Sequence, residues 1–204
     1  VLRDGKVVGK VKTSDTNKEE LANMMVGRPL ITSFEKGSVE ATKNILEIKN
    51  VRANNDRNLI ALKDISLDVK GGEILGIAGV DGKGQSELAE VLTGLRKTLG
   101  GKIILDGKDI TKLSTQAIRN LGVAYTPEDR MNIGLILEYS VSENLVLDKF
   151  SSSPFSKGLF MNQSEIDKYA KKLVSDFGIR TPCVDVPAKQ LSGGNLQKIV
   201  LAPP

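Results

Sequence analysis

The chain has 204 residues, a formal charge of +4 and 26% charged residues, enough for one well-buried domain and a smaller appendage. Aromatic residues make up 4%, and Lys and Arg are scattered, so the composition does not indicate a nucleic-acid-binding surface. The chain contains no histidine, which excludes His-dependent triads and His metal sites within it. The single cysteine, Cys183, excludes an internal disulfide framework and is typical of a reducing cytoplasm. No apolar run approaches the roughly 18 residues of a membrane span.

Residues 1–31 predict a small unit made of a hairpin and a helix. The dipeptide Asp4-Gly5 stands between short apolar stretches, a pattern typical of a hairpin turn. Thr16 is followed three residues later by a glutamate, which predicts a capping box at the start of a short amphipathic helix. Gly27 is expected to end that helix. The polar stretch 32–44 lacks periodicity and predicts a linker.

From residue 45 the pattern changes to that of an α/β domain. Apolar and polar residues alternate over 45–48 and 65–69, which predicts half-buried strands. Residues 74–78 form a short apolar run, typical of a buried strand, and 101–107 predict a strand followed by a turn. Residues 122–125 predict a further short strand.

A glycine-rich loop follows residues 74–78 and leads into apolar residues at helical spacing. Strand, glycine-rich loop and helix in this order form a phosphate cradle, because glycines leave backbone N–H groups unobstructed and a helix N-terminus carries partial positive charge. The candidate nucleotide-binding residues are Gly79, Asp81, Gly82, Lys83, Gly84, Gln85, Ser86 and Glu87.

The loop departs from the usual P-loop pattern G-x-x-x-x-G-K-[ST] at one position. Gly79, Gly84 and Ser86 fit, but Gln85 occupies the lysine position, and Lys83 stands two residues earlier. A charge-assisted hydrogen bond contributes about 1.5–3 kcal/mol. Its loss predicts roughly tenfold to hundredfold weaker nucleotide binding. The alternative is a tight strand–helix turn that holds no ligand.

Two further motifs follow in the second half of the chain. The polar loop 127–130 comes directly after the strand expected at 122–125, the position where open α/β sheets meet ligands, although a solvated loop remains the alternative. Helical spacing then dominates 139–180, with Ser164 as an expected N-cap. An apolar helix begins after Ser192 with two glycines. This helix start is either a second N-terminus that can bind an anion or simply a capped turn. Because this helix starts so late, we expect the chain to be incomplete at its C-terminal end.

These motifs together resemble the nucleotide-binding domain of an ABC transporter. The resemblance covers about residues 45–202 and depends on the cradle, the loop PEDR and the motif LSGGNLQK at 191–198. GVDGKGQSE, YTPEDR and SVSENLVL are similar to the second half of tandem ATP-binding proteins that serve bacterial importers of simple sugars and nucleosides. The signature-motif residues are Leu191, Ser192, Gly193, Gly194 and Asn195, and Glu128 falls at the Q-loop position.

The resemblance implies a fold and a division of the chain. The fold class is α/β, a P-loop NTPase-like ABC nucleotide-binding domain with a mixed sheet core and a helical subdomain. Residues 1–31 would be the end of a preceding nucleotide-binding domain, and 32–44 the linker. Residues 45–127 would form the core with its degenerate P-loop, 128–190 the helical subdomain, and 191–204 the signature motif with the start of its helix.

The resemblance also implies cofactors, partners and a location. ATP and Mg²⁺ would be bound, with Ser86 as the metal ligand, while the catalytic residues would lie outside this chain. The partners would be the first nucleotide-binding domain of the same parent, membrane permease subunits and, indirectly, a substrate-binding lipoprotein. The protein would be cytoplasmic and peripheral on the inner face of the membrane.

Two features limit the resemblance and leave alternatives open. Residues 45–65 lack the aromatic residue that often stacks on adenine in the family, and Gln85 replaces the P-loop lysine. The first alternative is therefore a non-catalytic regulatory or scaffold module with a vestigial phosphate loop. A free-standing P-loop kinase or GTPase is disfavoured, because LSGGN has no role there.

Overall fold

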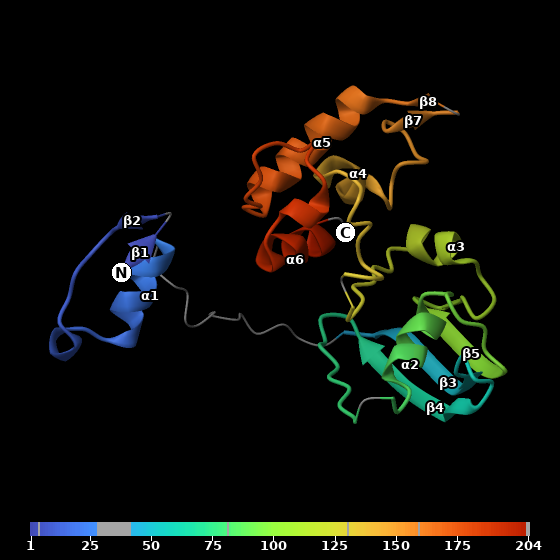
Figure 1. Ribbon diagram of the computed structural model, residues 1–204. Helices are drawn as coiled ribbons and strands as arrows, with labels where there is room; N and C mark the ends of the chain where they lie inside the picture. The colour runs from blue at the N-terminus through green and yellow to red at the C-terminus, as the bar shows by residue number, and fades with distance from the viewer. Residues whose placement is uncertain (4, 28–41, 81, 130, 159, 203–204) are drawn as a thin grey trace. The chain divides into compact units, whose positions relative to one another are not determined.

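The computed structural model describes residues 1–3, 5–27, 42–80, 82–129, 131–158 and 160–202 (Figure 1). The chain divides into two compact units, which are described separately. The first contains Val1–Lys43 and Gly71–Glu73, and the second contains Asn44–Lys70 and Ile74–Pro204. Asp4, Asp81 and Arg130 lie outside the described residues, as do 28–41, which include most of the expected linker.

The first unit contains the predicted hairpin. Strands β1 (Leu2–Arg3) and β2 (Lys6–Val7) pair antiparallel, and Gly5 adopts the positive φ of 74° that the turn needs. A 3₁₀ turn, η1, follows at Thr13–Asp15.

Helix α1 (Lys18–Val26) follows, and the predicted cap at Thr16 is wrong. Asn17 is the N-cap, and its side-chain oxygen accepts a hydrogen bond from the Glu20 N–H at 2.8 Å. Thr16 instead donates from its hydroxyl to the Glu20 carboxylate at 2.9 Å. Asn17 is one of the strongest N-cap residues, so it takes the position that Thr16 was expected to fill. Gly27 ends the helix with φ of 79°, as predicted.

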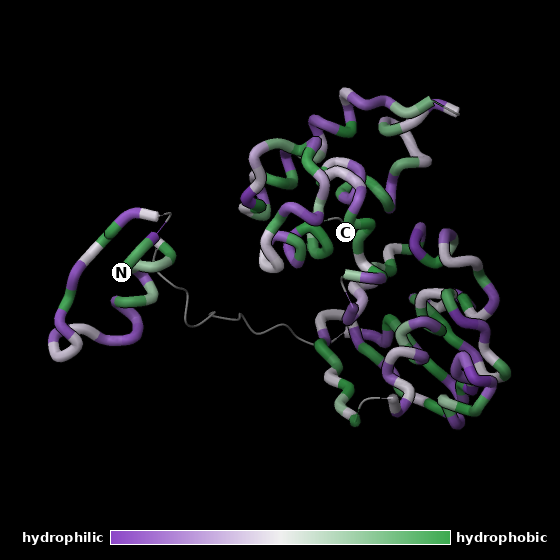
Figure 2. The backbone as a smooth tube through the Cα atoms, in the orientation of Figure 1, coloured by the Kyte–Doolittle hydropathy of each residue, from purple (hydrophilic) through white to green (hydrophobic). Residues whose placement is uncertain are grey.

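The second unit contains a four-stranded antiparallel sheet with the order β4-β3-β5-β6 (Figure 1). The strands predicted at 45–48 and 65–69 are confirmed within longer strands that pair as one hairpin. Hydrophobic and hydrophilic positions alternate along the sheet (Figure 2), so one face is buried and the other is solvated. The strands are β3 (Asn44–Asn54), β4 (Ile60–Lys70), β5 (Gly100–Leu105) and β6 (Lys108–Asp109).

Two helices complete the core of this sheet region. Helix α2 (Gln85–Leu92) follows the glycine-rich loop and packs on β3 and β4, and α3 (Thr115–Asn120) follows β6. Ser114 caps α3 by accepting from the Ala117 N–H at 3.3 Å. The buried residues of this core are Ile48, Val51, Ala53, Leu62, Leu88, Val91, Ile103, Ile110 and Ile118.

The strands predicted at 74–78 and 122–125 are not present. Neither segment forms a strand within the described part of the chain, and Gly122 lies in a turn with φ of 92°. Ile74 is 81% exposed and Ile77 is 54% exposed, the opposite of the burial that the apolar run predicted. A strand is stabilised by the hydrogen-bond ladder with a neighbour and by its cross-strand side-chain pairs. Without a paired neighbour, the apolar pattern alone does not produce one.

The remainder of the second unit is mainly helical. Helix α4 begins with a capping box, in which Ser140 accepts from the Glu143 N–H at 3.1 Å and the Glu143 carboxylate accepts from the Ser140 N–H at 2.7 Å. Asn162 caps α5, so the cap predicted at Ser164 is wrong by two positions. The elements are α4 (Val141–Val146), β7 (Ser156–Lys157), β8 (Phe160–Met161), α5 (Gln163–Asp176), η2 (Ala188–Gln190) and α6 (Gly193–Leu201).

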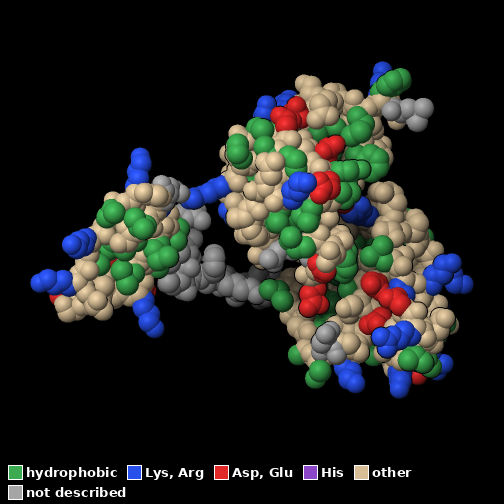
Figure 3. All heavy atoms as spheres, viewed as in Figure 1, with side chains coloured by type: hydrophobic (Ala, Val, Ile, Leu, Met, Phe, Trp, Pro, Cys, Tyr) green, Lys and Arg blue, Asp and Glu red, His purple; other side chains and the backbone are tan. Residues whose placement is uncertain are grey.

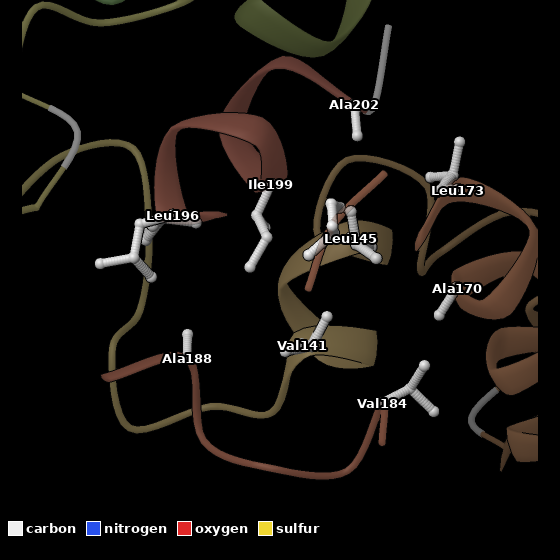
Figure 4. Packing of buried hydrophobic residues seen from close by; sticks show 11 residues of the cluster. Val141, Leu145, Ala170, Leu173, Val184, Ala188, Leu196, Ile199 and Ala202 are labelled. Atoms are coloured by element: carbon white, nitrogen blue, oxygen red, sulfur yellow. The ribbon is translucent and has the colours of Figure 1, made fainter. Parts of the chain in front are cut away.

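A second hydrophobic core holds these helices together (Figure 4). Leu145 of α4 and Ile199 of α6 point toward one another in the centre, and Val141 and Ala188 belong to the same cluster. The buried members are Leu135, Val141, Leu145, Ala170, Leu173, Ile179, Val184, Ala188, Leu196, Ile199 and Ala202. This core fixes the N-terminus of α6, because Leu196 and Ile199 anchor the helix from its second turn onward.

Candidate phosphate-binding site

The predicted cradle is a loop that enters α2 through a glycine. Gly84 is the N-cap of α2 with φ of 109°, and its carbonyl accepts from the Leu88 N–H at 2.9 Å. Gly82 has φ of 73°. Both values lie in the region that residues with a Cβ rarely adopt, so this backbone requires glycine at both positions. The glycine-rich spacing in the sequence therefore corresponds to real backbone constraints.

Strand β4 positions the start of α2. A Cβ on Gly84 would lie 3.1 Å from Leu62 Cδ2 and 3.2 Å from the Ala61 carbonyl oxygen, so the loop backbone passes close to the strand. Leu62 is itself buried in the core of the sheet. The first turn of α2 is therefore held against β4 by a close approach that only glycine permits. The sequence did not reveal this contact, because the strand was predicted only over 65–69, whereas β4 begins at Ile60 and includes Leu62.

The α2 N-terminus provides the expected anion-binding groups. The first N–H groups of a helix have no intrahelical acceptor, and the helix dipole places partial positive charge there. Ser86 and Lys83 are both exposed beside this end of the helix. Glu87 also lies in the first turn, and its negative charge would oppose a polyphosphate. A phosphate would therefore meet backbone donors, the Ser86 hydroxyl and the Lys83 ammonium.

The Gln85 side chain crosses the loop. Its Nε2 donates to the Val80 carbonyl at 3.3 Å, and a Cβ on Gly79 would collide with the same nitrogen. Its Oε1 is buried and, among the described residues, has no hydrogen-bond partner. A buried acceptor without a donor costs about 1–3 kcal/mol. The amide therefore fills the Gly79 side of the loop, while the groups at the α2 end fit a phosphate.

Glu128 lies in a loop that is organised by its neighbour. Asp129 Oδ1 accepts from the N–H groups of Met131 at 3.1 Å and Asn132 at 3.0 Å, which forms a local turn. Glu128 itself is exposed. Tyr125 has a raised pKa, first because of burial and then because of the negative charges of Glu90 and Glu128. Glu90 belongs to α2, so the phenol of Tyr125 lies near both the cradle helix and the Q-loop candidate. Tyr125 was not among the predicted site residues.

A hollow of about 450 Å³ adjoins this loop and is bordered by Tyr125, Pro127, Leu135 and Asn144. None of the described residues of 79–87 or 191–195 lines it. Asn144 is buried, and its amide donates to the carbonyls of Ile136 and Ser140 at 3.0 and 2.9 Å. The hollow is therefore a feature separate from the two predicted anion sites.

The signature-motif candidate forms the N-terminus of α6, as predicted. Ser192 is the N-cap, and its carbonyl accepts from the N–H groups of Asn195 at 2.9 Å and Leu196 at 3.0 Å. Gly194 has open space where a side chain would stand. Leu191 packs against the helical core, which anchors the motif. The helix therefore presents two glycine N–H groups at an unobstructed end.

The cradle and the signature motif belong to different parts of the second unit. Within the described residues, no hydrogen bond or ion pair joins 79–87 to 191–195. Lys and Arg side chains are dispersed over the face visible in Figure 3. No helix in the described part of the chain has the length and apolarity to cross a membrane. Each candidate anion site is thus built from its own backbone and local side chains.

Comparison with known proteins identifies the family. The family model of the ABC transporter domain matches residues 62–203. The chain belongs to the ABC transporter family. It is 40% identical over 201 residues to the guanosine import ATP-binding protein NupO of Bacillus subtilis, covering 98% of this chain and 39% of that protein. It is 41% identical over 204 residues to the glucose import ATP-binding protein TsgD13 of Haloferax volcanii, covering 99% and 37%.

Solved structures confirm the predicted fold class. An ATP-binding cassette of an ABC transporter in an ADP conformation aligns with a TM-score of 0.61 and 25% identity, over 79% of this chain and 64% of that chain. A dimeric cassette bound to ADP and phosphate aligns with a TM-score of 0.62 and 22% identity, over 78% and 68%. The chain spans about two fifths of the length of the curated relatives it matches.

Proposed function

We propose that this chain binds ATP as part of the ATP-binding subunit of an importer for simple sugars or nucleosides. The observation that carries the proposal is the pair of glycine-opened helix N-termini, at α2 and α6, in one chain of the ABC transporter family. The relatives named for guanosine and glucose import support the substrate class. In the whole protein, ATP binding and hydrolysis would drive transport.

The two sites would have different roles. The cradle would form a weakened nucleotide site, in which Gly82, Gly84 and Ser86 hold phosphate and Ser86 reaches Mg²⁺. The Gln85 amide against Gly79 supports the weakening, because it occupies one side of the loop. The signature motif would complete a second site whose cradle belongs to a preceding nucleotide-binding domain of the same parent. Residues 1–31 would be the end of that domain, and the catalytic residues would lie outside this chain.

The partners would be membrane permease subunits and, through them, a substrate-binding lipoprotein. The import functions printed for the relatives support a permease partner. The lobe 128–190 would dock on it, and the hollow bordered by Tyr125 and Leu135 is the feature of the structure that supports this surface. The protein would then be cytoplasmic and peripheral on the inner face of the membrane.

A second candidate is a regulatory or scaffold module with a vestigial phosphate loop. The hydrogen bond from Gln85 to Val80 favours it, because a loop closed by its own side chain needs no ligand to hold its shape. In that case the chain would contribute only the signature motif to nucleotide binding, and its own cradle would stay empty.

Calorimetric titration of the folded chain with ATP, with and without Mg²⁺, tests the proposal. Mg²⁺-dependent binding that Ser86→Ala weakens about tenfold would support a working cradle. The matched control is Ser175→Ala, an exposed serine in α5 whose loss should leave the affinity unchanged. Absence of binding by a folded chain would refute the cradle and leave the scaffold candidate.

A further inference from the structure

The side chain of Asn195 makes two hydrogen bonds inside the protein. Its Oδ1 accepts from the backbone N–H of Arg180 at 2.9 Å, and its Nδ2 donates to Ser192 Oγ at 3.0 Å. The first bond joins α6 to the chain that follows α5, across fifteen residues of sequence. Both ends of the amide are therefore engaged within the protein, which leaves Asn195 in a poor position to bind a nucleotide itself.

The partners fix the direction of both bonds. A backbone N–H can only donate, so the group that faces Arg180 must be the amide oxygen of Asn195. The group that faces Ser192 is then the NH₂, which can only donate. Ser192 Oγ must accept that bond, so its own hydroxyl hydrogen points away from Asn195. The direction of the Ser192 hydroxyl thus follows from the Arg180 N–H.

This arrangement differs from that of an ordinary N-cap serine. An N-cap serine usually accepts from the backbone N–H two or three residues later. Ser192 makes no such side-chain bond in α6, and the N–H groups of Asn195 and Leu196 bond to its carbonyl instead. The N–H groups of Gly193 and Gly194 have no hydrogen-bond partner among the described residues. The Ser192 hydroxyl and these two N–H groups are three donors at one helix end.

We propose that Asn195 is a positioning residue that sets the Ser192 hydroxyl as a donor to the terminal phosphate of a nucleoside triphosphate. This inference rests on the proposed function, because it needs a phosphate at the N-terminus of α6. It assigns to Asn195 an effect that passes through Ser192 rather than through direct contact.

The structure supplies a matched control for the link to the turn. Lys198 Nζ donates to the Gly178 carbonyl at 2.6 Å, a second bond between α6 and the same turn. Lys198 does not bond to Ser192 in the described structure. Lys198→Met therefore removes one bond between α6 and the turn and leaves the bond to the Ser192 hydroxyl in place. Asn195→Ala removes both the bond to the turn and the bond to the Ser192 hydroxyl.

The test is a titration with MgATP of the ¹⁵N-labelled chain, supplied with the unlabelled preceding nucleotide-binding domain whose cradle the proposed function requires, followed by the NMR signals of the Gly193 and Gly194 amides. We expect Ser192→Ala and Asn195→Ala each to weaken the response about tenfold, and the double variant to weaken it no further. Lys198→Met should match the wild type. Additive losses in the double variant, or a loss in Lys198→Met equal to that in Asn195→Ala, would overturn the proposal.

A second variant keeps the test independent of folding defects. Asn195→Asp retains an oxygen for the Arg180 N–H but offers Ser192 an acceptor, which would draw the hydroxyl hydrogen inward. We expect the Arg180 amide to stay protected from hydrogen exchange in Asn195→Asp and to lose protection in Asn195→Ala. The MgATP response should weaken at least about tenfold in both. A wild-type response in Asn195→Asp would overturn the positioning role alone, whereas unresponsive glycine amides in the wild type would also overturn the proposed function.

Discussion

Replacing Gly84 by alanine tests whether the cradle depends on its close approach to β4. The φ of 109° at Gly84 is unfavourable for any residue with a Cβ, and the new methyl would lie 3.1 Å from Leu62 Cδ2 and 3.2 Å from the Ala61 oxygen. The matched variant is Gly82→Ala. Gly82 also has a positive φ, 73°, but a Cβ added there would meet no atom within 4 Å among the described residues.

The two variants differ in the steric contribution to the loss of unfolding free energy. A residue held in a sparsely populated backbone region costs about 1–3 kcal/mol, and overpacking in a close-packed site costs a further amount of about 1–3 kcal/mol. Gly84→Ala includes both contributions and should destabilise the folded chain by about 2–6 kcal/mol. Gly82→Ala includes only the backbone contribution and should cost about 1–3 kcal/mol.

Urea denaturation followed by far-UV circular dichroism measures the difference. The midpoint of Gly84→Ala should fall clearly below that of Gly82→Ala, with similar slopes for both variants. Equal midpoints would refute the reasoning, because they would mean that the loop does not press against β4. A Gly84→Ala chain that keeps wild-type MgATP affinity would further show that this backbone is not needed for the phosphate.

The same structure supports three other predictions. Gln85→Lys should tighten ATP binding roughly tenfold to hundredfold in a calorimetric titration, because it restores a charge-assisted hydrogen bond; unchanged affinity would show that Lys83 already serves the phosphate or that the cradle is closed. Ser140→Ala should cost about 1 kcal/mol of unfolding free energy at pH 7. The Ser140 hydroxyl and then its N–H lower the pKa of Glu143, so the part of this stabilisation that the hydroxyl gives to the carboxylate is present above the ordinary Glu pKa of about 4.3 and is lost as pH falls further, while the cap bond from the Glu143 N–H remains; a difference between the two proteins that does not shrink in acid would contradict this linkage. Leu145→Ala should cost about 2–5 kcal/mol, because Leu145 is fully buried, whereas the half-exposed Leu201→Ala should cost much less by the same denaturation assay.

The residue pattern along the chain predicted the elements that are stabilised by residues close to one another in sequence. The alternation at 45–48 and 65–69 predicted β3 and β4, and the glycine-rich loop predicted the start of α2. Helix caps were predicted to within one or two residues, since several cap-forming residues stand together at each start. At α1 and α5 an asparagine takes the cap instead of the expected Thr16 and Ser164.

Features that depend on distant partners could not be predicted in the same way. The apolar run 74–78 indicated burial, but a strand also needs a neighbour to pair with, and sequence periodicity carries no information about that neighbour. The same reason applies to the bond between Asn195 and Arg180, which lie fifteen residues apart. Nothing in the sequence LSGGN indicated that its asparagine faces inward. Sequence patterns identified the motif, while the tertiary contacts assign roles within it.

Hydrogen exchange of the whole chain together with the preceding nucleotide-binding domain of the proposed parent, with and without MgATP and resolved by mass spectrometry, tests the central claim most directly. We expect nucleotide to slow exchange in two segments, 82–86 at the start of α2 and 193–195 at the start of α6. At both helix ends the first backbone N–H groups have no intrahelical acceptor, so they are available to a phosphate. Slowed exchange confined to other segments, or no change at saturating MgATP, would contradict the claim that these two ends bind nucleotide.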